Sequence, residues 1–138
     1  MVPATAHAVP EPRKKKGEYI IMDMYCFKGC DYKTEIEETE GGRQKNVTML
    51  TGEHESPFDA GIAEYSGEED PAIFDHTEYG DVVYILEGEM CFESNIAHQT
   101  FHGYAGDMVY MVKKEGLKMK VWSPNYGKIF WASYPHCY

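Results

Sequence analysis

The chain has 138 residues, of which 43% are hydrophobic and 14% aromatic, so it can form one folded domain with its own core. Its formal net charge of −10 disfavours binding to nucleic acids and anionic membrane surfaces, because an acidic surface repels phosphate groups. No apolar run approaches the ~18 residues that span a bilayer, and the first residues lack the apolar core of a signal peptide. We therefore expect a cytoplasmic protein whose four irregularly spaced cysteines are reduced.

The first 17 residues mix proline and alanine with a basic run from Arg13 to Lys16. Such a segment cannot bury a core face, so we predict a flexible N-terminal arm at residues 1–17 and a single domain at residues 18–138. The basic run could dock on an acidic partner, but a solvated tail is the simpler interpretation.

The rest of the chain consists of short apolar or alternating segments separated by turn residues. A first strand is expected within 19–27, followed by a charged segment at 33–45 in which Gly41-Gly42 marks a loop. Further strands are expected at residues 47–51, 60–66, 82–86, 89–94, 99–103, 107–112, 117–123 and 128–134. Short strands with turn signals about every 8 to 12 residues, and no helical period, predict an all-β sandwich or barrel.

The central stretch, residues 74–90, carries the strongest local signal. Its polar first part contains His76, Glu78, Tyr79 and Asp81, and the apolar run at 82–86 follows directly and ends at a predicted turn. If this run lines the inside of a small barrel, the polar groups before it stand at the barrel mouth, where a ligand or metal would be held.

Two segments resemble the conserved boxes of the cupin superfamily: residues 81–88, DVVYILEG, and residues 106–112, GDMVYMV. The finer resemblance is to the ethanolamine-utilisation Q-type (EutQ-like) cupins. It rests on Ser56-Pro57, Ala60-Gly61, Phe74-Asp75, Ser123-Pro124 and the ending Phe130 to Pro135. The resemblance implies a double-stranded β-helix, the cupin jelly-roll barrel, assembled as a homodimer.

Metal-binding cupins hold a divalent ion with two histidines and a glutamate from the first box and a histidine from the second. Carried over to this chain, the glutamate becomes Asp81, and the second histidine falls on His76 or, with shorter spacing, on Thr77. The first falls on Phe74 or Asp75, and the second-box histidine becomes Leu117. His76 and Asp81 would hold zinc, nickel, iron or manganese only weakly unless another group, such as Asp75 or Glu78, joins them.

The same two residues suit metal-free chemistry. His76 titrates near neutral pH and Asp81 could orient it, so the pair is a candidate general acid/base; the alternative is a histidine hydrogen-bonded to a carboxylate for structural reasons. Tyr110 is a further candidate catalytic residue if strand alternation points it into the barrel. The residues expected to contact substrate are Tyr84, Leu117, Met119 and Trp131.

Two hypotheses for the function follow. The first is a small-molecule enzyme, a lyase, isomerase or cyclase, acting on a small and mostly hydrophobic organic substrate in an apolar barrel. The second is a non-catalytic EutQ-like binding or assembly module. For both we expect a small-molecule ligand and a homodimer, and neither nucleic acid nor membrane as a partner.

Overall fold

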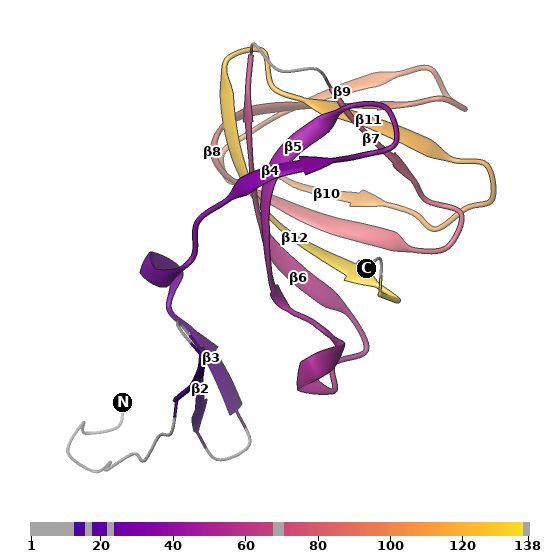
Figure 1. The fold of residues 1–138 in the computed structure, drawn as a ribbon. Helices are drawn as coiled ribbons and strands as arrows, with labels where there is room; N and C mark the ends of the chain where they lie inside the picture. The colour runs from indigo at the N-terminus through magenta and orange to yellow at the C-terminus, as the bar shows by residue number, and fades with distance from the viewer. Residues whose placement is uncertain (1–12, 16–17, 22–23, 68–70, 137–138) are drawn as a thin grey trace. The chain divides into compact units, whose positions relative to one another are not determined.

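The computed structural model describes residues 13–15, 18–21, 24–67 and 71–136, and the chain divides into two compact units between Lys33 and Thr34 (Figure 1). The first unit contains a three-stranded antiparallel sheet, β1 (Arg13–Lys15), β2 (Glu18–Ile21) and β3 (Met24–Phe27), and then a 3-10 turn, η2 (Gly29–Asp31). The strand expected at 19–27 is therefore a β2–β3 hairpin. The predicted boundary at residue 17 does not coincide with this division, and most of the predicted arm lies outside the described residues.

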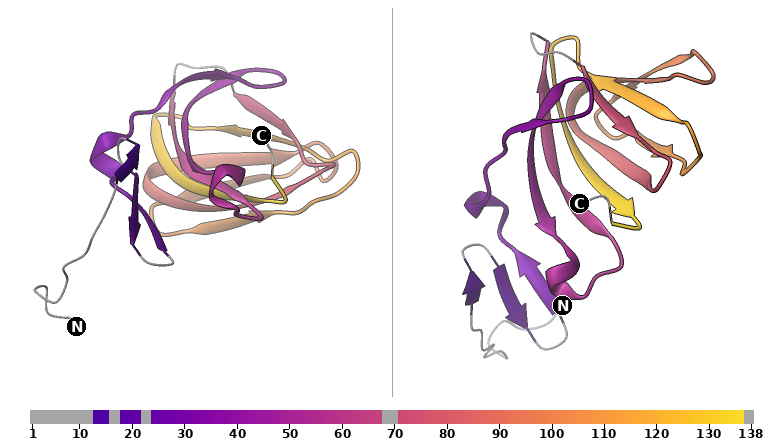
Figure 2. Two further views of the ribbon diagram at one scale, coloured as in Figure 1. Left: turned by 60° about the horizontal axis from the view of Figure 1, so that its bottom comes forward. Right: turned by 45° about the vertical axis from the view of Figure 1, so that its right-hand side comes forward.

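The second unit is one sheet of nine strands, joined in the order β4-β5-β6-β12-β8-β11-β7, with β9 and β10 also paired to β8. The strands are β4 (Glu35–Glu38), β5 (Arg43–Leu50), β6 (Asp59–Ser66), β7 (Ala72–Asp75), β8 (Gly80–Ser94), β9 (Thr100–Tyr104), β10 (Met108–Met111), β11 (Lys118–Trp122) and β12 (Tyr126–Tyr134), with a 3-10 turn, η3 (Gly52–His54), after β5. Figure 2 shows that this sheet curls round on itself. The all-β prediction is confirmed.

The long strand β8 organises the sheet because each half has different neighbours. Its first half pairs with β10 and β12, and its second half pairs with β9 and β11. Where the first half of β8 meets the second, Ile129 pairs with Ile85 and Lys128 with Glu87, so Leu86 is an extra residue without a partner position on β12. Gly88, two residues later, has a φ of 74°. The turn predicted at residues 87–88 is therefore wrong: a bulge bends the strand and lets it continue.

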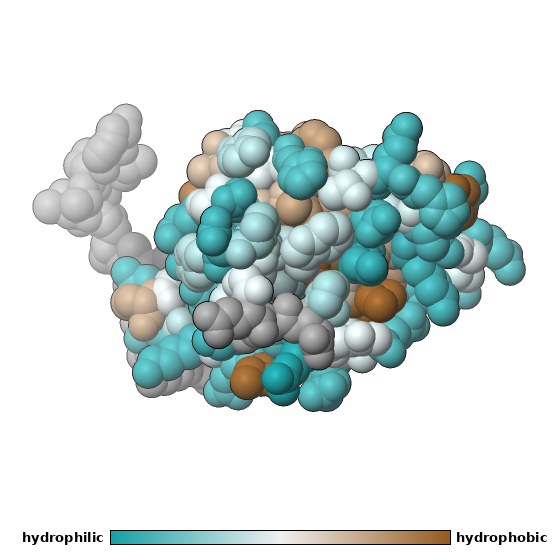
Figure 3. Space-filling view, turned by 90° about the horizontal axis from the view of Figure 1, so that it is seen from above, coloured by the Kyte–Doolittle hydropathy of each residue, from teal (hydrophilic) through white to brown (hydrophobic). Residues whose placement is uncertain are grey.

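Side-chain alternation along these strands builds the core. Val83 and Ile85 on β8 face the core, as do Ile129 and Trp131 on β12. The same cluster includes Ala63, Tyr65, Ala72, Met90, Phe92, Met111, Leu117, Met119 and Val121. Hydrophilic residues predominate on the face shown in Figure 3, as the net charge leads one to expect.

The loop predicted at Gly41-Gly42 lies between β4 and β5, but the sequence predicts no strand in the rest of the charged segment at 33–45. This segment contains β4, whose sequence is EIEE, and the start of β5, and the two strands pair from Glu35 opposite Asn46 to Glu38 opposite Arg43. β4 is an edge strand at the end of the sheet order, where charged residues are common, so its composition resembles that of a loop. No helix within the described part of the chain is long and apolar enough to cross a membrane.

Candidate functional site

The second unit contains a half-open cavity of about 480 Å³, which is within the usual size of small-molecule sites. Strands β4 to β8 and β10 to β12 contribute to its wall. Its apolar lining includes Phe74, Val83, Phe92, Met111, Val121 and Ile129. Its polar lining includes Glu37, Gln44, Asp75, Asp81 and Ser133. The cavity is therefore large enough for a small and largely apolar ligand.

His76 lies between β7 and β8 and is fixed by its own backbone. Its N–H donates to the carbonyl of Leu117 at 2.8 Å, and its carbonyl accepts from the N–H of Lys114 at 2.9 Å. Its ring Nδ1 lies 3.1 Å from the carbonyl oxygen of Tyr79, and the two rings are 4.8 Å apart. Because a carbonyl can only accept, Nδ1 carries the proton, and the neutral ring presents a lone pair at Nε2.

Asp81, at the start of β8, lies next to this lone pair. Its Oδ2 is 3.7 Å from Nε2 of His76, and its Oδ1 accepts a hydrogen bond from the hydroxyl of Ser133. The side chain of His76 has no exposed surface, whereas Asp81 lines the cavity. Asp81 is therefore the member of the pair that a molecule in the cavity can reach, whereas His76 is not among the lining residues.

Burial sets the protonation of both groups. It raises the pKa of Asp81 to about 7, against the opposing effect of the hydrogen bond from Ser133. It lowers the pKa of His76, partly opposed by the hydrogen bond to Tyr79 and the charge of Asp75. At neutral pH the imidazole is neutral and Asp81 is divided between acid and carboxylate, so Asp81 can act either as a proton donor or as a proton acceptor.

A second polar group on the wall was not predicted from the sequence. The amide nitrogen of Gln44 donates to Glu37 at 2.9 Å, and Gln44 accepts a hydrogen bond from the hydroxyl of Tyr65. The amide nitrogen of Asn46 lies 3.5 Å from the other oxygen of Glu37, and its oxygen accepts from the indole N–H of Trp131 at 2.8 Å. This network, which we call the Glu37 network, comprises Glu37, Gln44, Asn46, Tyr65 and Trp131. Its signal in the sequence is the alternation of polar residues along β5.

Of the other predicted site residues, only Trp131 lines the cavity, the position expected for it. Tyr84 and Tyr110 do not: 43% and 62% of their respective surfaces are exposed, because Val83 and Met111 take the inward positions on their strands. The inward orientation considered for these tyrosines is therefore corrected. Leu117 and Met119 are buried and, with Tyr110, border a separate and more open hollow of about 650 Å³.

The donor set does not fit a tightly bound metal ion. The described residues contain no group of three or more His, Cys, Asp and Glu side chains that could hold one. His76 Nε2 and Asp81 Oδ2 are two donors of suitable chemistry, but the expected second-box position, Leu117, is an apolar core residue. Two protein ligands hold zinc, nickel, iron or manganese only weakly.

The fold is shared with known proteins. An ethanolamine utilization protein Q from Salmonella typhimurium LT2 superposes with a TM-score of 0.67 and 18% identity, covering 93% of this chain and 94% of that one. The EutQ protein of Clostridium difficile gives a TM-score of 0.69 and 13% identity, covering 96% of this chain and 99% of that one. The cupin domain of Cnp3 from Schizosaccharomyces pombe gives 0.56 and 14%, covering 67% and 61%.

These likenesses confirm the predicted cupin β-barrel. No curated protein sequence matches this chain. A family model described as ethanolamine utilisation protein EutQ, however, matches residues 17–138, which is most of the chain. The chain therefore belongs to the EutQ family.

Proposed function

We propose that the cavity binds a small, mostly hydrophobic organic molecule and that Asp81 performs acid/base chemistry on it, in a reaction of the lyase, isomerase or cyclase type. The observation that carries this proposal is the buried Asp81 side chain on the cavity wall, with Nε2 of His76 at 3.7 Å behind it. A carboxyl group titrating near neutral pH in an apolar site suits proton transfer, because both of its forms are populated at the working pH.

The roles follow from the contacts. Asp81 removes a proton from the ligand as a carboxylate, or donates one as an acid. Ser133 holds Oδ1, which leaves Oδ2 as the oxygen that exchanges the proton. His76 is a positioning residue: its Nδ1–H is held by Tyr79, so its Nε2 lone pair faces Oδ2 and favours the protonated form of Asp81.

A probe reaction tests this proposal without knowledge of the natural substrate. Nitrobenzisoxazole is a small, neutral aromatic molecule that opens when a base removes its ring C–H proton and the N–O bond breaks, producing a coloured phenolate. We expect catalysis by the wild-type protein, a rate that rises with pH through the pKa of Asp81 at about 7, and a loss of about 100-fold or more in Asp81→Asn.

Glu35→Gln is the matched control, because Glu35 is exposed and does not line the cavity. Equal rates in the wild type, Asp81→Asn and Glu35→Gln would show that the cavity carboxylate is not an accessible base. The protein would then be a binding module.

We also propose that the protein forms a cytoplasmic homodimer. The outer face of the sheet carries two adjacent rows of uncharged residues. One row, across β10, β8, β12 and β6, is Met108, Tyr84, Phe130 and Ile62, and the other, across β10, β8 and β12, is Tyr110, Val82 and Ala132. We name these seven residues the outer face. A second copy is the partner that suits it, because uncharged rows let two chains of net charge −10 approach. The same face favours the alternative function, a non-catalytic EutQ-like assembly module.

A further inference from the structure

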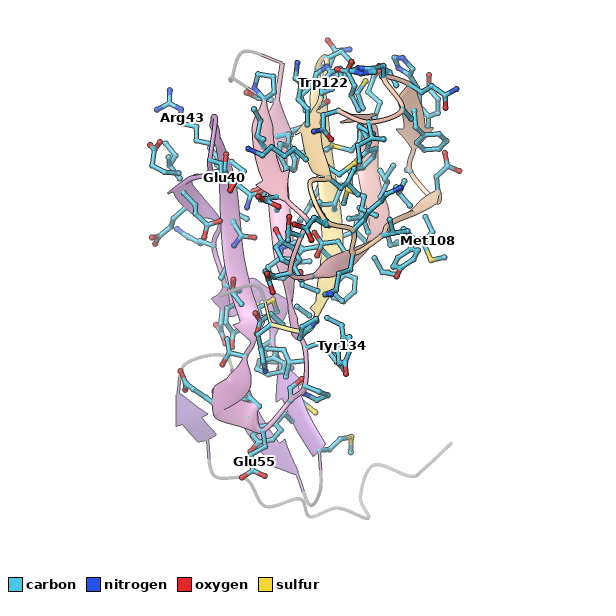
Figure 4. All side chains as sticks on the ribbon, turned by 90° about the vertical axis from the view of Figure 1, so that its right-hand side faces the viewer. Glu40, Arg43, Glu55, Met108, Trp122 and Tyr134 are labelled. Atoms are coloured by element: carbon cyan, nitrogen blue, oxygen red, sulfur yellow. The ribbon has the colours of Figure 1, made fainter. Side chains whose placement is uncertain are left out.

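The cavity wall combines aromatic side chains with carboxyl groups. Several of its lining residues are aromatic, namely Tyr65, Phe74, Tyr79, Phe92 and Trp131. Several others carry carboxyl groups, namely Glu37, Glu38, Glu40, Asp75 and Asp81. Among the described residues that line the cavity there is no Lys, Arg or His. Figure 4 shows Glu40 in the turn after β4, next to the strand that carries Glu37 and Glu38.

This combination selects ligands by charge. Carboxylates that line a cavity attract a cation and repel an anion, and aromatic rings attract cations through their negative faces. A phosphate or carboxylate ligand would have no positive side chain to pair with on this wall. A neutral ligand would gain only from contact with the apolar part of the wall.

The Glu37 network places one of these carboxylates beside two of the aromatic side chains. Both oxygens of Glu37 are approached by amide nitrogens, at 2.9 Å from Gln44 and 3.5 Å from Asn46. The same two amides accept the hydroxyl of Tyr65 and the indole N–H of Trp131, so the polar ends of these rings are occupied. What Tyr65 and Trp131 offer a ligand is therefore the ring itself, beside a carboxylate whose position is fixed.

The surroundings of Asp81 also favour a positive charge in the cavity. Nε2 of His76 is fully buried and finds no hydrogen-bond donor within the described part of the chain. It lies 3.7 Å from Oδ2 of Asp81, which lines the cavity. An unsatisfied acceptor in that position adds to the negative potential and again favours a cation.

We infer that the ligand of this cavity is an organic ammonium ion, a protonated or quaternary amine attached to an apolar or aromatic body. This inference rests on the proposed function and names its substrate class. Glu37 binds the ammonium group, the aromatic rings surround it, and Asp81 remains the acid/base group. Separate carboxylates therefore serve binding and chemistry.

The test is a calorimetric titration with three probes of nearly equal size and different charge: benzylammonium, benzyl alcohol and benzoate. We expect benzylammonium to bind about tenfold more tightly than benzyl alcohol, and benzoate to bind more weakly than either. Benzyltrimethylammonium is a second cation, which cannot donate a hydrogen bond and so reports the aromatic contribution; we expect it also to bind more tightly than benzyl alcohol.

The variant Glu37→Gln keeps a side-chain oxygen for the amide of Gln44 and removes the charge. We expect it to abolish most of the preference for benzylammonium while binding benzyl alcohol as the wild type does. Glu35→Gln makes the same change of charge on the same strand outside the cavity and should keep the preference. Wild-type binding of benzyl alcohol also shows that the variant is folded.

The outcomes separate this inference from the proposed function. If benzyl alcohol or benzoate binds as tightly as benzylammonium, or if Glu37→Gln keeps the preference, the ligand class is wrong while acid/base chemistry by Asp81 stands. If no probe binds and nitrobenzisoxazole is not turned over, both are overturned. A tenfold preference for the cations that Glu37→Gln removes and Glu35→Gln retains supports the inference.

Discussion

Nε2 of His76 lies 3.7 Å from Oδ2 of Asp81, and both side chains are buried. The distance is longer than a good hydrogen bond, and Nε2 has no other partner within the described residues. Burial moves both groups toward their neutral forms, since it raises the pKa of Asp81 and lowers that of His76. At neutral pH the contact is thus between a neutral ring and a carboxyl group that has only partly ionised, so it is not a full ion pair.

The first prediction concerns Asp81 and stability. Its pKa is raised from 3.8 to about 7 on folding, so its protonated form stabilises the folded state below pH 3.8, and this stabilisation is lost as the pH rises through about 7. The full effect is about 4 kcal/mol. Asp81→Asn should therefore be more stable than the wild type above pH 7 and should lack this pH dependence.

Urea unfolding at about pH 5 and about pH 8 measures this difference. Glu35→Gln, which changes an exposed carboxylate, should follow the wild type at both values. A wild-type protein whose stability does not fall relative to Asp81→Asn between the two would show that Asp81 is not desolvated.

The second prediction concerns His76, where the sign is opposite. Its pKa is lowered below 6.5, so the neutral ring stabilises the fold above pH 6.5, and this contribution is lost as the pH falls below that value. His76→Leu should remove this loss, although it also removes the hydrogen bond to Tyr79. The measurement is the slope of unfolding free energy against pH below 6.5, with the exposed residue His98 changed to Asn as a control.

Nitrogen NMR provides an independent check on the ring. We expect His76 to be the neutral tautomer with its proton on Nδ1 at neutral pH, because Nδ1 faces the carbonyl of Tyr79. A charged ring, or a proton on Nε2, would contradict the role given to the lone pair beside Asp81.

The pairing of His76 with Asp81 could be predicted because the two residues are close in sequence, on either side of a strand entrance. The orientation of Tyr84 could not. The run Val82 to Leu86 is apolar throughout, so its sequence does not show which alternate residues face the core. Val83 and Ile85, or Val82, Tyr84 and Leu86, could do so equally well. In the structure Val83 and Ile85 are buried, and Tyr84 is on the opposite side of the sheet.

The Glu37 network could not be predicted for a different reason. Its members come from β4, β5, β6 and β12, and Trp131 is 85 residues from its partner Asn46. Contacts across such separations depend on strand order, which local patterns do not determine. The segment with Glu37 also gives no strand signal in the sequence, because an edge strand of sequence EIEE has no alternation of apolar residues.

The third prediction tests this network. Asn46→Leu removes the acceptor of the Trp131 indole N–H, a buried hydrogen bond of 2.8 Å, and should cost about 1 to 3 kcal/mol of stability. In a Trp131→Phe background the same change should cost clearly less, because the donor is absent. Denaturant unfolding of the four proteins in this double-mutant cycle gives the coupling energy, and a value near zero would show that the two side chains act independently.

The fourth prediction concerns the bend in β8. A Cβ at Gly88 would lie 2.0 Å from the carbonyl oxygen of Tyr126, and its φ is 74°, so Gly88→Ala should cost about 2 kcal/mol or more. Gly106 has a φ of 98° with open space around it, so Gly106→Ala should cost only the backbone strain, about 1 kcal/mol. Thermal unfolding of the two variants compares them, and equal losses would mean that the close approach at the bend is unimportant.

The fifth prediction concerns the outer face. Tyr84 lies between Met108 and Phe130 in a row across three strands, with 43%, 65% and 38% of their respective surfaces exposed. In a symmetric dimer, a lysine at the centre of this row would bury one charge from each chain in the interface. Tyr84→Lys should therefore shift the protein to the monomer, as measured by sedimentation equilibrium. Ile96→Lys makes the same change at an exposed loop residue and should leave the dimer intact.

Because Tyr84 is on the opposite side of the sheet from the cavity, a monomeric Tyr84→Lys protein that still turns over nitrobenzisoxazole would show that assembly and chemistry are separable. If Tyr84→Lys leaves the mass unchanged, a dimer uses another surface.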